Sequence, residues 1–175
     1  MRRWISTLSG ALVAAAPACA DVSVQAYGPG QYFDELRYWV SSVLPSQGAN
    51  SYGPANLFDG SDRTAWCEGV PGTGSGESIT ISFGGEAMPL RLMVRNGYAK
   101  SADIHAKNAR PRNVRVSTST GNWYVTELAD TMGWQELPLV AEWISWVEVS
   151  IRDVYPGTKY TDTCISALEV DFEGG

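Results

Sequence analysis

Hydrophobic and polar residues alternate along most of the second half of the chain. Ile79, Ile81 and Phe83 alternate with Thr80 and Ser82. The same period of two recurs in the runs 90–95, 114–117, 123–126, 147–152 and 168–172. Successive side chains of a strand point to opposite faces, so each run predicts a strand with one buried and one solvated face.

The remaining segments predict one more strand and one helix. Residues 38–44 form a strand-like run that Pro45 closes, and only residues 101–109 look helical, with Ser101 as the N-cap. The chain carries 18 Gly and 9 Pro, which weaken helix interiors and mark turns. We therefore predict an all-β fold, an eight-stranded antiparallel jelly-roll sandwich with one short helix.

The N-terminus has the pattern of a signal peptide. A basic start at Arg2 and Arg3 precedes a short uncharged apolar run, and small residues around Ala20 suit cleavage there. We predict a signal peptide over 1–20, an N-terminal extension over 21–37 and the sandwich domain over 38–173. A lipoprotein, with Cys19 as its first residue, is the weaker alternative. No later apolar run approaches 18 residues, so no membrane insertion is expected.

Removing residues 1–20 leaves 11 Lys and Arg against 19 Asp and Glu, a charge of −8. Such a balance argues against nucleic acid as a partner. Cys67 and Cys164 remain, and an exported pair is more often a disulfide than two free thiols. Two buried thiols that never meet are the alternative. A metal site at these two cysteines is a poor interpretation, since the only other soft ligand is His105.

The positive charge is concentrated in one segment. Seven of the eleven cations lie between residues 91 and 115, with Asp103 as the single acid there. They are Arg91, Arg95, Lys100, Lys107, Arg110, Arg112 and Arg115. The segment is either the solvated face of two strands and a helix, or a local site for an anionic or polyhydroxylated ligand.

A turn rich in side-chain oxygens covers residues 56–64, just before Trp66. Asn56, Asp59, Asp62 and Thr64 offer the carboxylate, amide and hydroxyl oxygens that Ca²⁺ prefers. An Asx-rich turn that bonds its own backbone explains the same residues equally well. We expect no catalytic centre: the Gly-rich loop at 70–76 lacks the Lys of a phosphate-binding loop. His105 is expected to be a surface residue, not a general base.

Several sequence blocks resemble one family. The most specific are Asn-Gly-Tyr-x-Lys at 96–100 and Tyr-Pro-Gly-x-Lys-Tyr at 155–160. Further matching blocks lie at 42–45, 52–60, 64–66, 107–111 and 165–169. Together they resemble the discoidin-like, galactose-binding-type sandwich domains, in particular the glycan-binding domain attached to secreted bacterial NAD-glycohydrolase toxins.

The resemblance implies a jelly roll, a structural Ca²⁺ and a ligand face. The Ca²⁺ would be held by Asp59, Asp62, Thr64 and Glu169, and Cys67 would lie near Cys164. The residues implied for the ligand face are Tyr98, Lys100, Asn108, Arg110, Tyr155, Lys159 and Tyr160. The alternative is that these residues only lock the 100–111 excursion against the 155–160 loop.

We therefore expect an exported, non-enzymatic carbohydrate-binding module for an acidic or polyhydroxylated glycan. The alternative is a protein-interaction domain of the cell envelope that uses Trp134, Trp146 and the acidic surface. A glycan-cleaving enzyme ranks last, because it needs two carboxylates facing each other across a cleft. Fold-level similarity alone fixes no ligand.

Overall fold

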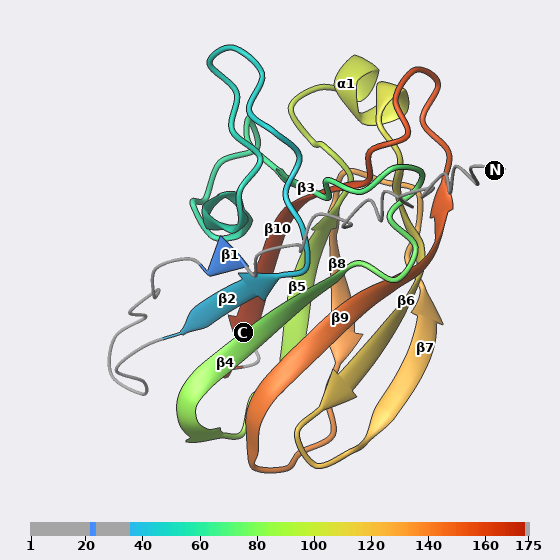
Figure 1. The fold of residues 1–175 in the computed structure, drawn as a ribbon. Helices are drawn as coiled ribbons and strands as arrows, with labels where there is room; N and C mark the ends of the chain where they lie inside the picture. The colour runs from blue at the N-terminus through green and yellow to red at the C-terminus, as the bar shows by residue number, and fades with distance from the viewer. Residues whose placement is uncertain (1–21, 24–35, 174–175) are drawn as a thin grey trace, which may run out of the picture.

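Two antiparallel sheets pack face to face in a computed structural model that describes residues 22–23 and 36–173 (Figure 1). The six-stranded sheet has the order β1-β2-β4-β9-β6-β7, and the four-stranded sheet has the order β3-β10-β5-β8. The strands are β1 (Val22–Ser23), β2 (Arg37–Val40), β3 (Trp66–Cys67), β4 (Ser78–Ala87), β5 (Arg91–Asn96), β6 (Arg110–Thr118), β7 (Trp123–Glu127), β8 (Trp134–Pro138), β9 (Ile144–Tyr155) and β10 (Cys164–Asp171). This confirms the predicted antiparallel β-sandwich.

The alternation seen in the sequence places the core between the sheets. Ile79, Ile81 and Phe83 of β4 are buried, while Thr80 and Ser82 between them are half-buried on the outer face. The same holds for the buried valines and isoleucine of β9. Removing this apolar surface from water is the main stabilising contribution to the fold.

The described residues hold ten strands instead of the predicted eight. Two of them, β1 and β3, have two residues each, which is too short for any alternation to show. A third, β8, carries only Leu137 as a buried residue and ends on Pro138, so its sequence has no clear period. Pairing with β5 defines it.

Short helical turns connect the strands at one end of the sandwich. The 3₁₀ turn η2 covers Pro54–Leu57, and the helix α1 covers Ala102–Lys107. The Ser101 hydroxyl accepts a hydrogen bond from the Ile104 N–H at 3.2 Å, which confirms Ser101 as the N-cap. Of the described helices, none is long and apolar enough to cross a membrane.

The disulfide between Cys67 and Cys164 is formed, as expected from an exported cysteine pair. It joins β3 to β10, where the two cysteines are directly paired in register. The bond closes a separation of 97 residues. Chain-entropy reasoning gives long loops of this kind the largest stabilisation, about 4–5 kcal/mol as an upper value.

The expected surface position of His105 is wrong, because its side chain is only 7% exposed. Gly97, at the end of β5, has a φ of +73°, and a Cβ there would lie 2.7 Å from the His105 ring. The imidazole therefore packs against the backbone of Gly97, a contact that the helical pattern of 101–109 does not reveal.

The predicted signal peptide over 1–20 lies outside the described residues. Of the predicted extension, residues 22–23 form β1 against β2.

Candidate functional site

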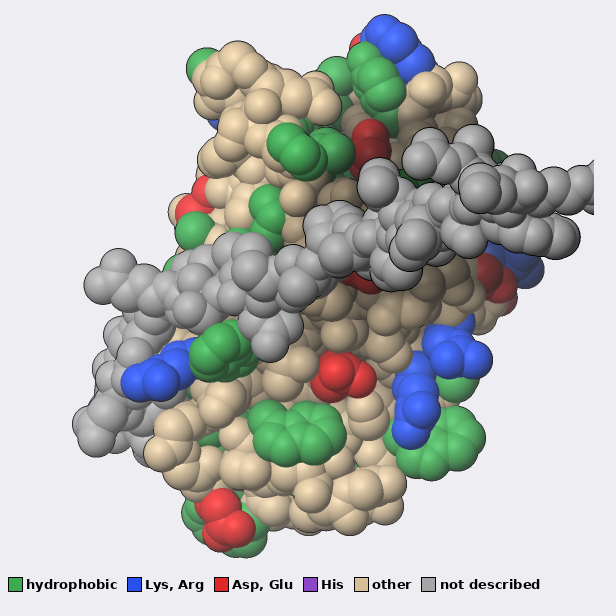
Figure 2. Space-filling view, viewed as in Figure 1, with side chains coloured by type: hydrophobic (Ala, Val, Ile, Leu, Met, Phe, Trp, Pro, Cys, Tyr) green, Lys and Arg blue, Asp and Glu red, His purple; other side chains and the backbone are tan. Residues whose placement is uncertain are grey.

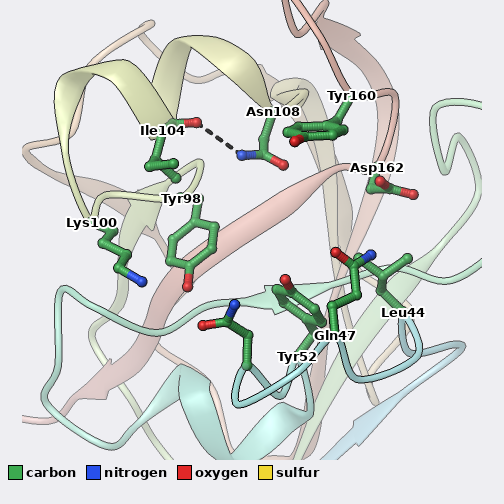
Figure 3. Close-up of a pocket in the computed structure, with 10 residues that line it drawn as sticks. Leu44, Gln47, Tyr52, Tyr98, Lys100, Ile104, Asn108, Tyr160 and Asp162 are labelled. Atoms are coloured by element: carbon green, nitrogen blue, oxygen red, sulfur yellow. Dashed lines mark hydrogen bonds between the residues drawn. The ribbon is translucent and has the colours of Figure 1, made fainter.

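A pocket lies where the loop after β2 faces α1, at the same end of the sandwich (Figures 1 and 3). Its volume is about 190 Å³. We call it the α1 pocket. It is lined by Leu44, Gln47, Asn50, Tyr52, Tyr98, Lys100, Ile104, Asn108, Tyr160 and Asp162. Polar side chains and phenol rings therefore dominate its wall.

The floor of the α1 pocket rests on the disulfide. Tyr52 and Tyr98 meet edge to face with ring centroids 6.4 Å apart, and both pack in one buried cluster with Cys67 and Cys164. The Tyr98 hydroxyl donates to the Arg63 carbonyl at 3.0 Å. Cross-linked strands thus hold both rings in fixed positions.

The two sides of the α1 pocket come from distant parts of the chain. Figure 3 shows Lys100 and Asn108 on the α1 side, and Gln47 with Tyr52 across from them. The Asn108 amide N–H donates to the Ile104 carbonyl at 2.9 Å, which orients the amide. Tyr160 and Asp162 close the pocket from the segment before β10.

Charge and hydrogen-bonding capacity in the α1 pocket are largely unused by the described residues. None of them forms an ion pair with Lys100 or Asp162, nor a side-chain hydrogen bond with Gln47. Burial, followed by Asp162 and Tyr160, raises the pKa of Tyr52. Burial also raises the pKa of Tyr98. Both phenols therefore stay protonated at neutral pH and keep a donor hydroxyl.

The structure divides the seven predicted ligand residues into two groups. Tyr98, Lys100, Asn108 and Tyr160 line the α1 pocket. The other three, Arg110, Tyr155 and Lys159, do not line it. Their predicted role in ligand binding stays a prediction.

Arg110 and Tyr155 belong to a separate polar cluster. The Arg110 guanidinium pairs with Asp130 and lies 5.7 Å from the centre of the Tyr155 ring. The Tyr155 hydroxyl lies 3.1 Å from a Glu127 carboxylate oxygen and 3.0 Å from the Leu128 carbonyl oxygen, either of which can accept its proton. The Lys159 ammonium lies 4.9 Å from the Tyr160 ring centre. Contacts within the protein therefore engage all three.

Sequence reasoning missed six lining residues: Leu44, Gln47, Asn50, Tyr52, Ile104 and Asp162. Gln47 and Asn50 lie in a turn-rich segment with no period, where their two backbones form an isolated bridge. The amide-rich composition of that turn was the one available signal. The block at 52–60, which includes Tyr52, carries the family resemblance but no separate sign of ligand binding.

Most cations of the basic segment are paired with nearby carboxylates. Arg91 pairs with Glu136 and Asp171, Arg112 with Glu127, and Lys107 with Asp103. Arg95 and Arg110 also form ion pairs, and Arg115 stacks on Trp123 at 4.7 Å. Lys100 is the member of this segment that lines the α1 pocket. The local charge excess thus reduces to one cation at the site.

The oxygen-rich turn is closed by its own hydrogen bonds. Asp59 accepts from the Ser61 N–H at 2.8 Å and from the Thr64 hydroxyl at 2.7 Å, and Asp62 pairs with Arg95. Glu169 lies half-buried on β10, where burial raises its pKa. Residues 22–23 and 36–173 contain no group of three His, Cys, Asp or Glu gathered as for a metal ion. A calcium ion held by Asp59, Asp62, Thr64 and Glu169 stays a prediction.

A family model matches residues 33–173, and its description reads NAD glycohydrolase translocation F5/8 type C domain. No curated protein sequence matches the chain. Solved structures share the fold at low sequence identity.

A Clostridium perfringens module, CpGH89CBM32-5, was solved in complex with GalNAc-β-1,3-galactose. It superposes with a TM-score of 0.60 at 17% identity, over 78% of this chain and 94% of that module. The family 32 carbohydrate-binding module of C. perfringens NanJ, in complex with galactose, gives a TM-score of 0.55 at 11% identity, over 77% of this chain and 92% of that module. Chitosan-binding module 1 from a Paenibacillus sp. IK-5 chitosanase/glucanase gives a TM-score of 0.53 at 21% identity, over 76% of this chain and 92% of that module.

Proposed function

Because this chain belongs to the NAD glycohydrolase translocation F5/8 type C domain family, and because it forms a polar, phenol-walled pocket, we propose that it is an exported, non-enzymatic carbohydrate-binding module. The α1 pocket carries this proposal. The similar modules from C. perfringens and Paenibacillus, solved with sugars or named for chitosan, support it at the level of the ligand class.

The chemistry of the α1 pocket suits a sugar. The phenol ring of Tyr160, which is 41% exposed, offers apolar surface for the carbon face of a pyranose ring, while Tyr52 and Tyr98 line the pocket as buried side chains. Gln47, Asn50 and Asn108 supply amide donors and acceptors for ring hydroxyls. A wall with few apolar side chains would bind a purely hydrophobic ligand poorly.

Binding without cleavage is favoured by the charges on the wall. Glycoside hydrolysis uses two carboxyl groups on opposite sides of the scissile bond. Asp162 is the one carboxylate among the described lining residues. Its neighbours Tyr52 and Tyr160 supply hydroxyls but no second acid. The proposal therefore assigns the α1 pocket to recognition.

Lys100 sets the preference within the sugars. Its ammonium lines the α1 pocket with no ion pair from the described residues, so a ligand carboxylate would gain a charge-assisted hydrogen bond. An acidic sugar is therefore the favoured ligand, with neutral sugars bound through the tyrosines and amides. Export rests on the predicted signal peptide over 1–20.

Calorimetry with galacturonate and galactose tests this assignment, since the two sugars differ by one carboxylate. Lys100→Ala should weaken galacturonate binding by about tenfold or more and leave galactose binding nearly unchanged. Lys159→Ala is the matched control, because Lys159 lies against Tyr160 but does not line the α1 pocket. Failure of the unmodified protein to bind either sugar would overturn the proposal. An equal loss in Lys159→Ala would move the site away from the α1 pocket.

A further inference from the structure

A row of side chains crosses the outer face of the six-stranded sheet. Trp39 of β2 is paired with Thr80 of β4, and Thr80 is paired with Glu148 of β9. Glu148 is paired in turn with Ser117 of β6, and Ser117 with Trp123 of β7. Directly opposite residues point to the same face of a sheet, so two tryptophans stand at the ends of one polar row.

The neighbouring rows repeat this chemistry. Ser82 is paired with Trp146, so a third indole stands on the same face two residues along β9 from Glu148. On the other side of the row, Ser78 is paired with Ser150. The buried residues that alternate with them, such as Val147 and Ile79, point into the core. We call this surface the tryptophan face; it comprises Trp39, Ser78, Thr80, Ser82, Ser117, Trp123, Trp146, Glu148 and Ser150, with Arg37 opposite Ser82 and Arg115 opposite Ser150.

The register fixes how far apart the Cα atoms of the three tryptophans lie. Four strand spacings separate Trp39 from Trp123, a span of about 19 Å. Trp146 is offset by two strands and two residues from each of them, so it lies about 12 Å from both. A chain of several sugar units is long enough to extend over these backbone separations.

Two of the three indoles are exposed, Trp146 is half-buried, and Trp123 is oriented by a neighbour. Trp39 is 38% exposed and Trp123 is 61% exposed. The Arg115 guanidinium lies 4.7 Å from the Trp123 ring centre, a cation–π contact that restricts the indole. Figure 2 shows hydrophobic side chains on this side of the molecule separated by uncharged polar side chains and backbone, with an acidic group near the central one and basic groups beside the outer ones.

We propose that the tryptophan face binds a linear polysaccharide, with sugar rings stacked on the indoles and ring hydroxyls bonded by the Ser and Thr side chains. This goes beyond the α1 pocket, since it uses none of its lining residues and shares only the premise that the ligand is a carbohydrate. A protein partner fits less well, because protein interfaces centre on a desolvated apolar core depleted of charge. Here hydroxyls, Glu148 and two arginines, Arg37 and Arg115, lie among the indoles.

Affinity electrophoresis in gels containing soluble chitosan or galactan tests the proposal, with glucosamine and galactose as single-unit counterparts. Trp39→Ala and Trp123→Ala should each weaken retardation by at least one polymer by about tenfold, and the pair by more. Trp39→Tyr should keep most of the binding because it keeps a ring. Trp143→Ala is the matched control: Trp143 is also 61% exposed but precedes β9 and is not on the tryptophan face.

The outcomes separate the two sites. Polymer binding that survives Lys100→Ala and is lost in the Trp variants supports the tryptophan face, whatever the α1 pocket binds. Polymer binding unaffected by Trp39→Ala, Trp123→Ala and their combination overturns it, as does equal loss in Trp143→Ala. Absence of retardation by both polymers also overturns it, while single-sugar calorimetry still decides the α1 pocket. Unchanged melting temperatures show that the variants are folded.

Discussion

Gly97 controls a close approach of chain segments next to the α1 pocket. Its φ of +73° is a conformation that side chains with a Cβ rarely adopt, and the His105 ring fills the space where a Cβ would lie. The turn from β5 into the residues before α1 therefore depends on a missing side chain. Tyr98, the next residue, takes its place on the pocket floor from this turn.

Gly97→Ala should lower the free energy of unfolding by about 2 kcal/mol or more, because it combines an unfavourable φ with a clash. Gly121→Ala is the control, since Gly121 has a φ of +90° but a Cβ added there would meet nothing within 4 Å. Urea unfolding of both variants measures the difference. Equal losses at the two positions would mean that the contact with His105 contributes nothing.

Burial next to Gly97 also makes the free energy of unfolding depend on the protonation of His105. Burial first, then Arg110, lowers its pKa from the ordinary value of 6.5, while Asp130 acts in the opposite direction. Just below pH 6.5, the imidazole is protonated in the unfolded chain but stays neutral in the native protein. The free energy of unfolding should therefore fall as pH drops from about 7 to about 5.5.

His105→Gln should flatten the pH dependence in this window, and urea unfolding at several pH values measures it. The chain has one histidine, so its imidazole signals in an NMR titration give the native pKa without ambiguity. A native pKa at or above 6.5 would contradict the prediction. So would an unfolding free energy that is constant across the window in the unmodified protein.

At the scale of elements, β3 is a very short strand that a disulfide joins to β10. It has two residues and pairs with β10 at Trp66 and Cys67. Trp66 adds a hydrogen bond from its indole N–H to the Ser42 carbonyl at 2.9 Å. Because so short a strand gains little from its own ladder, the disulfide and the buried Trp66 side chain add to what holds β3 to its sheet.

Breaking the disulfide should lower the free energy of unfolding by about 2–4 kcal/mol. The Cys67→Ser, Cys164→Ser double variant and dithiothreitol treatment of the unmodified protein should agree. Urea unfolding measures both, and the intact mass should rise by two hydrogens on reduction of the unmodified protein alone. An unfolding curve that reduction leaves unchanged would contradict the prediction.

At the scale of the whole molecule, local patterns predicted what is local. The period of two in 79–83 and 147–152 identified strands, and the Ser101 cap identified α1, because neighbouring residues decide these features. The disulfide was predictable from the number of cysteines and from the signal peptide that the sequence predicts. The α1 pocket was only half predictable: its α1 side carries sequence blocks, while Gln47 and Asn50 sit in a turn without a pattern.

Charge shows why the rest could not be predicted. Counting along the chain isolates a basic segment, but ion pairs join residues far apart in sequence. Arg91 meets Asp171, and Arg110 meets Asp130 across a different loop. The tryptophan face has the same origin: its row exists only in the register of five strands. Sequence composition records neither partner nor register.

The place of β10 in its sheet sets an order of events during synthesis. It lies between β3 and β5, yet it is the last strand of the described chain. A nascent chain that ends before residue 164 has neither the central strand of the four-stranded sheet nor the second cysteine. Such a chain leaves β3 and β5 without the strand that pairs with both of them, so the sandwich and the pocket floor can be completed only after residues 164–171 have left the ribosome.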